Sequence, residues 1–337
     1  MHRRAIISDV HGNLPALEAV LADIQTQNVG DIVCLGDICG YGPQPIECIE
    51  RVRAAAKWVL LGNHDEAIFQ EPANFSRNAY DAIVWQRTIL DPDKLLGATP
   101  EQIAQARERW EWLKSLLPTC TEKNVRYVHA SPRDPLHEYV LREDFDVGSG
   151  GPTRMGTEIM ADVEWLCFCG HSHRPGVVAE DYKWWLPDAL PEHKSLIRPG
   201  FKTIVNVGSV GQPRDGIAEA CYAIFEYDPP KDIPLLPPLP AHSMNSTIIM
   251  SKNAAAETQL ASAVPHGTSL VDPLEWNDEE TRNEQDPELQ RARESIVLMT
   301  PKVFFRRVPY NIEAAQSRFF AVPDLPRYNG LRLAVGK

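Results

Sequence analysis

A short apolar run that ends in Asp, Asn or His recurs along this chain, and this pattern constrains the fold most. Residues 4–8 form the first run and lead into Asp9 and His11. Short runs rich in β-branched residues are typical of buried strands. Four later runs end in the same residue types, at Asp37, Asn63, His129 and the pair His171 and His173. Because ligands bind at the carboxyl ends of strands in open α/β sheets, the pattern predicts a polar site there.

Helical segments alternate with these strands. The sequence predicts helices over 14–27 and 43–56, with Asn13 as the N-cap of the first. Two more are expected at 76–90 and 100–117, the latter opened by a Thr99 to Gln102 capping box, and a short one over 153–162. We expect the 72–118 segment to wall one side of a cleft. The order of elements predicts a layered α/β domain.

A composition change divides the chain. Residues 228–241 hold six prolines, 245–264 are rich in Ser, Ala and Asn, and 272–286 are strongly acidic. We therefore predict one domain made of residues 1–228 and 301–322, with 229–300 as a flexible insertion and 323–337 as a C-terminal tail. The strands at 220–226 and 303–308 are expected to pair as a hairpin whose turn the insertion replaces, since loop closure costs grow slowly with length.

Composition narrows the class of protein. A hydrophobic fraction of 43% and a charged fraction of 24% are typical of a soluble globular protein. The net charge of −12 argues against a general nucleic-acid surface, and no apolar run is long enough to span a membrane. The seven cysteines form no CxxC pair, and no signal peptide opens the chain, so we expect a cytoplasmic protein.

The strand-end residues offer too many ligands for one tetrahedral ion. They suit two cations that share a carboxylate, and water completes the coordination. Two such cations can clamp the oxygens of a phosphoryl displacement and supply a bridging hydroxide at neutral pH. Among divalent ions we expect Mn²⁺ first, with Fe, Ni²⁺ and Zn²⁺ as alternatives for this oxygen and nitrogen set. The ligand set is Asp9, His11, Asp37, Asn63, His129, His171 and His173.

In order along the chain, these motifs resemble the metal motifs of the calcineurin-like metallophosphoesterases. Gly208 to Asp215 and Arg307 to Tyr310 further resemble a bacterial subgroup of small phosphoesterases. The resemblance implies a four-layer αββα sandwich of two mixed sheets between helices. It assigns Asp9, His11 and His173 to one metal, assigns Asn63, His129 and His171 to the other, and makes Asp37 the bridge.

The resemblance also implies catalytic and substrate-binding residues. His64 would be the general acid that protonates the leaving oxygen, and Asp65 would orient its ring. Arg214 would clamp the phosphate, or else brace its own loop through Asp215. Asn13 and Arg133 are further substrate-binding candidates, and Tyr41 is a weaker one.

We therefore expect a dinuclear metal-dependent phosphoesterase that acts on a small phosphate mono- or diester. A nuclease or a nucleotide pyrophosphatase of the dinucleoside polyphosphate type could use the same site. A non-catalytic protein-binding scaffold of the same fold is the alternative from another class. Such a scaffold would be expected to have lost ligands or the acid, and this chain retains them all.

Overall fold

The computed structural model describes residues 1–72, 74–146, 148–228 and 300–337. All of them belong to one compact unit that comprises residues 1–238 and 299–337. The predicted insertion, 229–300, lies outside the described residues except for Thr300. Within the described part, no helix has the length and apolar character needed to cross a bilayer.

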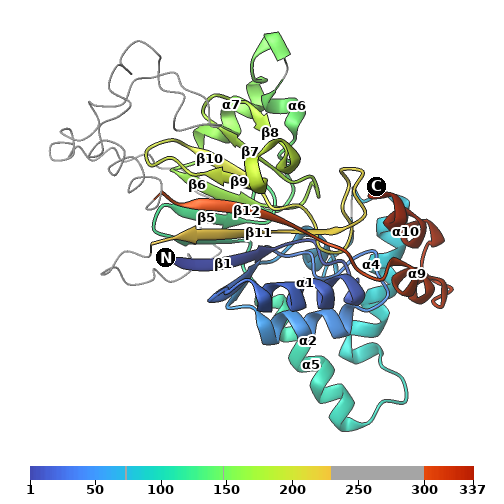
Figure 1. The fold of residues 1–337 in the computed structure, drawn as a ribbon. Coiled ribbons are helices and arrows are strands. Elements are labelled where there is room, and N and C mark those ends of the chain that lie inside the picture. Colours follow the sequence, from blue (N-terminus) through green and yellow to red (C-terminus); the bar gives the residue numbers. More distant parts are fainter. Residues whose placement is uncertain (73, 147, 229–299) are drawn as a thin grey trace, which may run out of the picture. The chain divides into compact units, whose positions relative to one another are not determined.

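The first sheet is mixed and has the strand order β3-β2-β1-β11-β12-β9 (Figure 1). β1 pairs in parallel with β2 and antiparallel with β11, which in turn pairs antiparallel with β12. The predicted pairing of the two strands that flank the insertion is therefore confirmed. The strands are β1 (His2–Ile7), β2 (Asp31–Cys34), β3 (Trp58–Val59), β9 (Lys194–Leu196), β11 (Ala220–Tyr227) and β12 (Lys302–Val308).

The second sheet is also mixed and has the order β4-β5-β6-β10-β7-β8. β6 lies between β5 and β10 and is parallel to both. Its strands are β4 (Thr119–Glu122), β5 (Val125–Val128), β6 (Leu166–Cys169), β7 (Gly176–Ala179), β8 (Trp184–Trp185) and β10 (Thr203–Asn206).

The helices surround these sheets, and their predicted caps are present. The Asn13 side chain accepts from the Ala16 N–H, and Thr99 and Gln102 form the capping box. The helices are α1 (Leu14–Thr26), α2 (Pro45–Ala55), α3 (Asn63–Ala67), α4 (Arg77–Leu90), α5 (Pro100–Lys114), α6 (Arg142–Phe145), α7 (Arg154–Ala161), α9 (Ile312–Phe320) and α10 (Arg327–Leu331). Short 3₁₀ turns include η6 (Arg332–Val335), which follows α10 directly.

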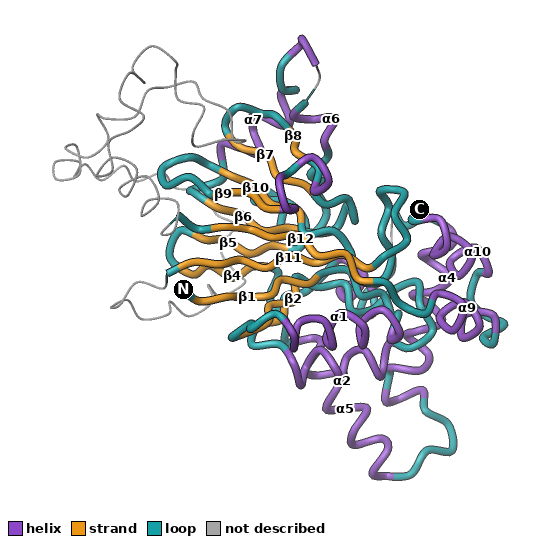
Figure 2. Tube along the Cα trace, viewed as in Figure 1, coloured by secondary structure: helices purple, strands orange, loops and turns teal. Residues whose placement is uncertain are grey.

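Side-chain alternation along the strands explains the layers. On β1, Ala5 and Ile7 pack with residues of α1 and α2, whereas Ile6 packs with residues of both sheets. On the second sheet, Cys167 and Cys169 pack against α6 and α7, while Phe168 faces the first sheet. The two sheets therefore lie face to face with helices outside them, as Figure 2 shows, and the predicted αββα class is confirmed.

A buried cation links the sheets. Arg4 on β1 is 1% exposed, and its guanidinium donates to Asp31 on β2 at 2.6 Å. It also donates to Glu122 on β4 at 2.5 Å and to the Tyr127 hydroxyl on β5 at 2.9 Å. Because a buried charge is tolerated only when it is paired and hydrogen-bonded, this group fixes the first sheet against the second.

Candidate active site

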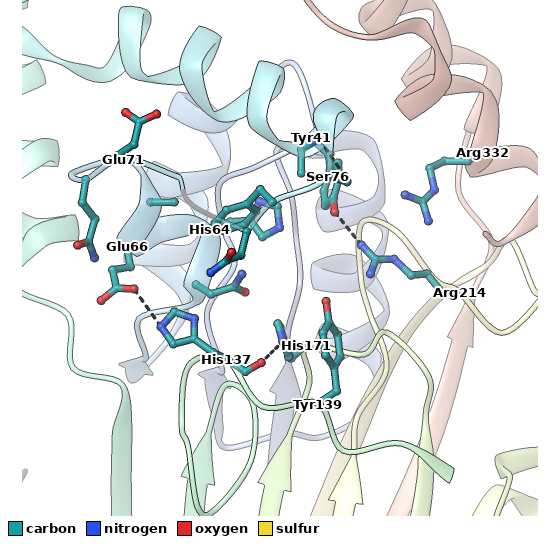
Figure 3. Close-up of a pocket in the computed structure, with 16 residues that line it drawn as sticks. Tyr41, His64, Glu66, Glu71, Ser76, His137, Tyr139, His171, Arg214 and Arg332 are labelled. Carbon is teal, nitrogen blue, oxygen red and sulfur yellow. Dashed lines mark hydrogen bonds and ion pairs between the residues drawn. The ribbon is translucent and has the colours of Figure 1, made fainter. Parts of the chain in front are cut away.

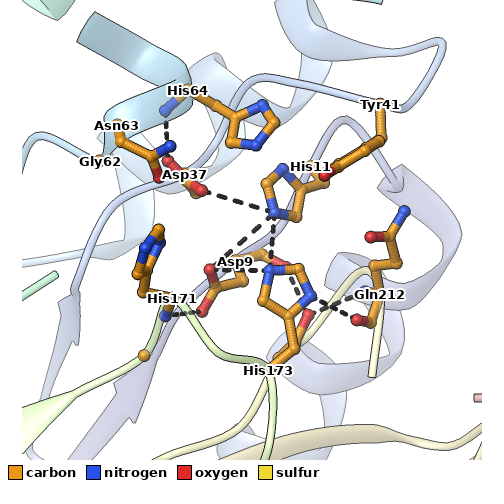
Figure 4. A network of polar contacts seen from close by, with 12 residues as sticks. Asp9, His11, Asp37, Tyr41, Gly62, Asn63, His64, His171, His173 and Gln212 are labelled. Carbon is orange, nitrogen blue, oxygen red and sulfur yellow. Dashed lines mark hydrogen bonds and ion pairs between the residues drawn. The ribbon is translucent and has the colours of Figure 1, made fainter. Parts of the chain in front are cut away.

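The polar residues that end the predicted strands meet in one buried group (Figure 4). Asp9 and Asp37 follow β1 and β2 of the first sheet, whereas His129 and His171 follow β5 and β6 of the second. The most exposed member, Asn63, is only 8% exposed. The group therefore lies at the edge where both sheets end, and it unites all the ligands predicted from the sequence: Asp9, His11, Asp37, Asn63, His129, His171 and His173.

Most of these residues have a left-handed backbone. The φ angles are 56° at Asp9, 48° at His11, 54° at Asp37, 61° at His171 and 58° at His173. Each costs an L-residue about 1–2 kcal/mol, and such strain clusters at functional sites. Hydrogen bonds between the loops after β1 and β2 hold this backbone in place. The His11 N–H donates to the Asp37 carbonyl at 2.9 Å, and the Asp9 N–H donates to the Gly36 carbonyl at 3.0 Å.

Two glycines allow the close approach that the site needs. A Cβ at Gly62 would lie 2.1 Å from Asp37 Oδ1, and one at Gly170 would lie 2.5 Å from Asp9 Oδ2. Neither distance leaves room for a methyl group. Glycine is therefore required at both positions for the carboxylates to sit where they do.

Asp9, His11 and His173 form one candidate metal cluster. His173 Nε2 lies 3.2 Å from Asp9 Oδ1, and His11 Nε2 lies 3.1 Å from His173 Nε2. A second cluster comprises Asp37, His129 and His171. There His129 Nε2 lies 3.4 Å from Asp37 Oδ2, 3.2 Å from His171 Nδ1 and 3.1 Å from Asn63 Oδ1.

Asp37 adjoins both clusters. Its Oδ2 lies 3.6 Å from His11 Nε2, in addition to its contact with His129. Its other oxygen, Oδ1, accepts the His64 N–H at 2.8 Å. The two oxygens of Asp9 also differ in their contacts, because Oδ2 accepts the His171 N–H at 3.1 Å. Asp9 Oδ1 and Asp37 Oδ2 are buried and have no hydrogen-bond partner among the described residues.

The outer nitrogens of the histidines fix their tautomers. Nδ1 of His11, His129 and His173 lies 2.7, 3.1 and 2.5 Å, respectively, from the carbonyl oxygens of Cys39, Leu35 and Gln212. His171 uses Nε2 instead, 3.2 Å from the His137 carbonyl. Because a carbonyl only accepts, each of these nitrogens carries the proton. When a ring is neutral, its inward nitrogen therefore presents a lone pair, as a metal-binding histidine does.

These distances fit bound cations. Two ligands at right angles, each about 2.1 Å from an ion, lie about 3.0 Å apart. The inward nitrogens of His11 and His173 are separated by 3.1 Å, and those of His129 and His171 by 3.2 Å. Facing lone pairs and unpaired carboxylate oxygens would otherwise be unfavourable in a buried site. The donor set therefore fits metal ions in both clusters, with oxygen and nitrogen ligands in each.

Electrostatics agree with this assignment at Asp9, Asp37 and His171, whereas burial opposes but Asp37 raises the pKa of His129, to about 9. Burial opposes the ionisation of Asp9 and Asp37, but His173 beside Asp9 and His129 beside Asp37 hold the pKa of both carboxyls below the usual range. Burial and the neighbouring His129 lower the pKa of His171 to about 3. Both carboxylates are thus ionised and His171 is neutral near pH 7, which are the forms that bind a metal.

His64 lies beside the metal ligands. Its ring is 5% exposed and contacts the rings of His11, Tyr41 and Phe75 at centroid distances of 4.8, 4.7 and 4.8 Å. Its Nδ1 is buried without a partner among the described residues. Burial and the charge of Arg214 lower the pKa of His64 well below its usual value.

The structure corrects the expected partnership of Asp65 with His64. Both Asp65 oxygens accept backbone N–H groups, Oδ1 from Cys39 at 2.8 Å and Oδ2 from Gly62 at 3.2 Å. Neighbours on a helix point about 100° apart, so adjacent residues of α3 do not face each other. Burial and the charge of Asp37 raise the pKa of Asp65 to about 6. Asp65 therefore ties the loop after β2 to the start of α3.

A pocket of about 770 Å³ opens beside this group (Figure 3). His64, Asn63, His171 and Arg214 line it, together with residues that carry no sequence motif. Among the latter, Tyr139 stacks on His171 with ring centroids 4.0 Å apart, and Phe75 contacts His64. Phe75, Ser76 and Ala79 come from the 72–118 segment, which forms part of the pocket wall as predicted.

The substrate-binding candidates occupy different places. Arg214 and Tyr41 line the pocket. Asn13 is buried, caps α1 and donates to the Gly211 carbonyl at 2.8 Å. Arg133 does not line the pocket and pairs with Glu138 and Glu158. The alternative in which Arg214 is held by Asp215 is not seen, because Asp215 pairs with Arg307.

Comparisons with known proteins agree with this geometry. Residues 3–229 match the model of the calcineurin-like phosphoesterase superfamily domain. The chain is 35% identical over 231 residues to a protein of Methanocaldococcus jannaschii, covering 66% of this chain and 82% of that one. It is 30% identical over 105 residues to the phosphodiesterase YfcE of Escherichia coli, covering 28% of this chain and 55% of YfcE.

A solved structure covers nearly the whole chain. The metallophosphoesterase from Sphaerobacter thermophilus aligns with a TM-score of 0.61 and 28% identity, over 99% of this chain and 100% of that one. The family match, the phosphodiesterase relative and the clustered ligands lead to one conclusion. The chain belongs to the calcineurin-like phosphoesterase superfamily and is a metal-dependent phosphoester hydrolase.

Proposed function

We propose that this protein is a dinuclear phosphoesterase that hydrolyses a small phosphate monoester or diester in the cytoplasm. Asp9, His11 and His173 would hold one cation. Asn63, His129 and His171 would hold the other, and Asp37 would contact both. A pair of divalent cations, of which we expect Mn²⁺ first, supplies Lewis acidity that neutralises phosphoryl charge and makes water nucleophilic near neutral pH.

One observation carries this proposal. Asp9 and Asp37 each have one oxygen held by a backbone N–H, and each has a second oxygen that faces imidazole nitrogens without a hydrogen bond. Two buried carboxylates of this kind, surrounded by histidines whose outer nitrogens are fixed, form a rigid seat for positive charge. Because Asp37 adjoins both clusters, the arrangement supports a shared ligand between two ions.

The side chains at the pocket supply the remaining functions. Arg214 would grip a phosphoryl oxygen, since a guanidinium matches phosphate geometry. His64 would donate a proton to the leaving oxygen. Its imidazole is neutral in the free protein because burial and Arg214 lower its pKa. A phosphate dianion beside the ring would favour the protonated form, and the resulting imidazolium is a strong acid.

The proposal is tested by hydrolysis assays with Mn²⁺ on p-nitrophenyl phosphate, its bis-p-nitrophenyl diester and glycerol phosphate. We expect Asp37→Ala to abolish turnover of all three. Equal turnover by the wild type and Asp37→Ala would reject the proposal. His193→Ala is the matched control, because it changes a largely exposed histidine that belongs to neither metal cluster.

The role of His64 has its own test. We expect His64→Ala to slow hydrolysis of glycerol phosphate by about 10²–10⁴-fold. The loss should be much smaller for p-nitrophenyl phosphate, because nitrophenolate leaves without a proton. An equal loss on both substrates would contradict proton donation by His64.

A further inference from the structure

The pocket beside the metal ligands is electrostatically divided. In Figure 3, Arg214 and Arg332 lie on one side, Glu66 and Glu71 lie on the other, and His64 lies between them. Glu66 and Glu71 have protein partners, His137 at 3.5 Å and the Tyr80 hydroxyl at 3.1 Å. The cationic side is different, because no Asp or Glu side chain of the described residues pairs with either guanidinium.

Arg214 is held by neutral groups. Its Nη2 donates to the Tyr41 hydroxyl at 3.1 Å and to Gln212 Oε1 at 2.8 Å. Its Nε is buried and has no partner in the described part of the chain. The nearby Asp215 is engaged by Arg307. The guanidinium is therefore fixed in position while its charge is left uncompensated.

Arg332 comes from η6, beyond residues 3–229 that match the family model. Its Nε donates to the main-chain oxygen of Lys337, and its guanidinium lies over the rings of Tyr41 and Tyr328 at 5.9 and 5.7 Å. Burial and the positive charge of Arg214 lower the pKa of Arg332. Two cations on one pocket wall repel each other, and this repulsion would be relieved by a bound anion.

The two arginines lie at different depths. The Arg214 N–H donates to the carbonyl of the metal-ligand candidate His173 at 3.1 Å, and Figure 3 shows the Arg214 side chain nearer to His171 than that of Arg332. Arg332 instead lies against the rings of Tyr41 and Tyr328. Both guanidinium groups lie over the ring of Tyr41, that of Arg214 at 5.5 Å and that of Arg332 at 5.9 Å from its centroid. Arg214 is thus the inner cation and Arg332 the outer one.

We propose that Arg332 binds a second anionic group of the substrate, a phosphoryl or a carboxylate, while the reacting phosphoryl group lies at Arg214 and the metal ligands. The natural substrate is then a phosphate ester with two anionic groups. This inference rests on the proposed function of the same site. It gives the C-terminal segment a role in specificity.

Binding of stable phosphonates to the Mn²⁺-loaded protein, measured by calorimetry, tests the inference without turnover. Propylphosphonate carries one anionic group, phosphonopropionate adds a carboxylate, and propane bisphosphonate adds a second phosphonate. We expect the wild type to bind at least one of the doubly anionic ligands about tenfold more tightly than propylphosphonate. The ligand with the larger advantage identifies the second group as carboxylate or phosphoryl.

Variants assign this advantage to the outer arginine. In Arg332→Gln the advantage should fall below about twofold, whereas Arg332→Lys should keep part of it. Arg327→Gln, on the same C-terminal segment and stacked over Phe320, should retain all of it. An advantage that persists in Arg332→Gln, or is absent from the wild type, would overturn the inference.

Hydrolysis separates this inference from the proposed function. If the wild type hydrolyses glycerol phosphate but prefers neither phosphoglycerate nor bisphosphoglycerate, the phosphoesterase proposal stands and the second-anion inference fails. If the phosphonates bind as expected but no phosphate ester is hydrolysed, the proposed function fails and the anion site at Arg332 stands.

Discussion

Substitution of Gly62 by alanine tests how tightly the site is built. The backbone at Gly62, with φ −93° and ψ 167°, is one that alanine adopts freely. The new Cβ, however, would lie 2.1 Å from Asp37 Oδ1 and 2.2 Å from the Asp37 backbone nitrogen. Ordinary contacts begin at about 3.5 Å. Asp37 must therefore move by about 1 Å or more, and it cannot do so by side-chain rotation alone.

The cost follows from what that movement breaks. Overpacking of this kind costs about 1–3 kcal/mol. Displacing Asp37 also weakens the hydrogen bond that its Oδ1 accepts from His64 N–H at 2.8 Å, a loss of about 1–3 kcal/mol for a charged acceptor. We expect Gly62→Ala to lower the free energy of unfolding by about 2–6 kcal/mol. Mn²⁺ affinity should fall at least about tenfold.

Urea unfolding of the metal-free protein, followed by calorimetric titration with Mn²⁺, measures both effects. Gly150→Ala is the matched control, because no atom beyond its two chain neighbours lies within 4 Å of the added Cβ. We expect that variant to stay within about 0.5 kcal/mol of the wild type. A Gly62→Ala protein that loses under about 1 kcal/mol and binds Mn²⁺ like the wild type would refute this account of the Asp37 corner.

Three further predictions address the rest of the molecule. Burial opposes the ionisation of Asp31, but Arg4 holds the pKa of this carboxyl below its usual range. The stabilising effect of the ionised Asp31 is therefore complete above about pH 4, and it is lost as the pH falls through the lowered pKa of Asp31 in the folded protein. Asp31→Asn should lower the free energy of unfolding by about 3 kcal/mol at pH 7 and weaken its decrease at acidic pH. Urea unfolding at a series of pH values measures both effects, and an unchanged decrease at acidic pH would contradict this prediction. Arg133→Gln should keep kcat/KM within about twofold of the wild-type value, because Arg133 is paired outside the pocket. A loss of about tenfold would indicate that Arg133 does bind the substrate. Removal of the metal by a chelator should lower Tm, and added Mn²⁺ should restore it. For an ion present at 1,000 times its Kd, the loss in free energy of unfolding is about 4 kcal/mol. A Tm that Mn²⁺ does not change would exclude tight binding.

The strand ends could be predicted because their signals are local. Each apolar run stops at a ligand residue, and parallel strands bring their carboxyl ends to one edge of a sheet. The left-handed backbone at Asp9 and His171 carries no such signal, because Asp and His usually adopt ordinary conformations. Only packing within the folded site fixes these corners.

Features that depend on long-range contacts were missed or misassigned. β9, at the edge of the first sheet, is three residues long and, among the strands that the structure describes, pairs only with β12, so its short sequence gives little strand signal. Asp65 looks like a partner of His64 because it follows it in sequence, yet α3 turns the two side chains apart. Arg332 reaches the pocket through the packing of the C-terminal helices, where Leu325 and Leu333 pack with Phe319, and no motif marks it.

The central claim is that two cations share Asp37. Anomalous diffraction at the manganese edge, from crystals grown with MnCl₂, tests it most directly. Two peaks are expected, one among Asp9, His11 and His173 and one among Asn63, His129 and His171, both within coordination distance of Asp37. A single peak, or peaks away from these side chains, would contradict it.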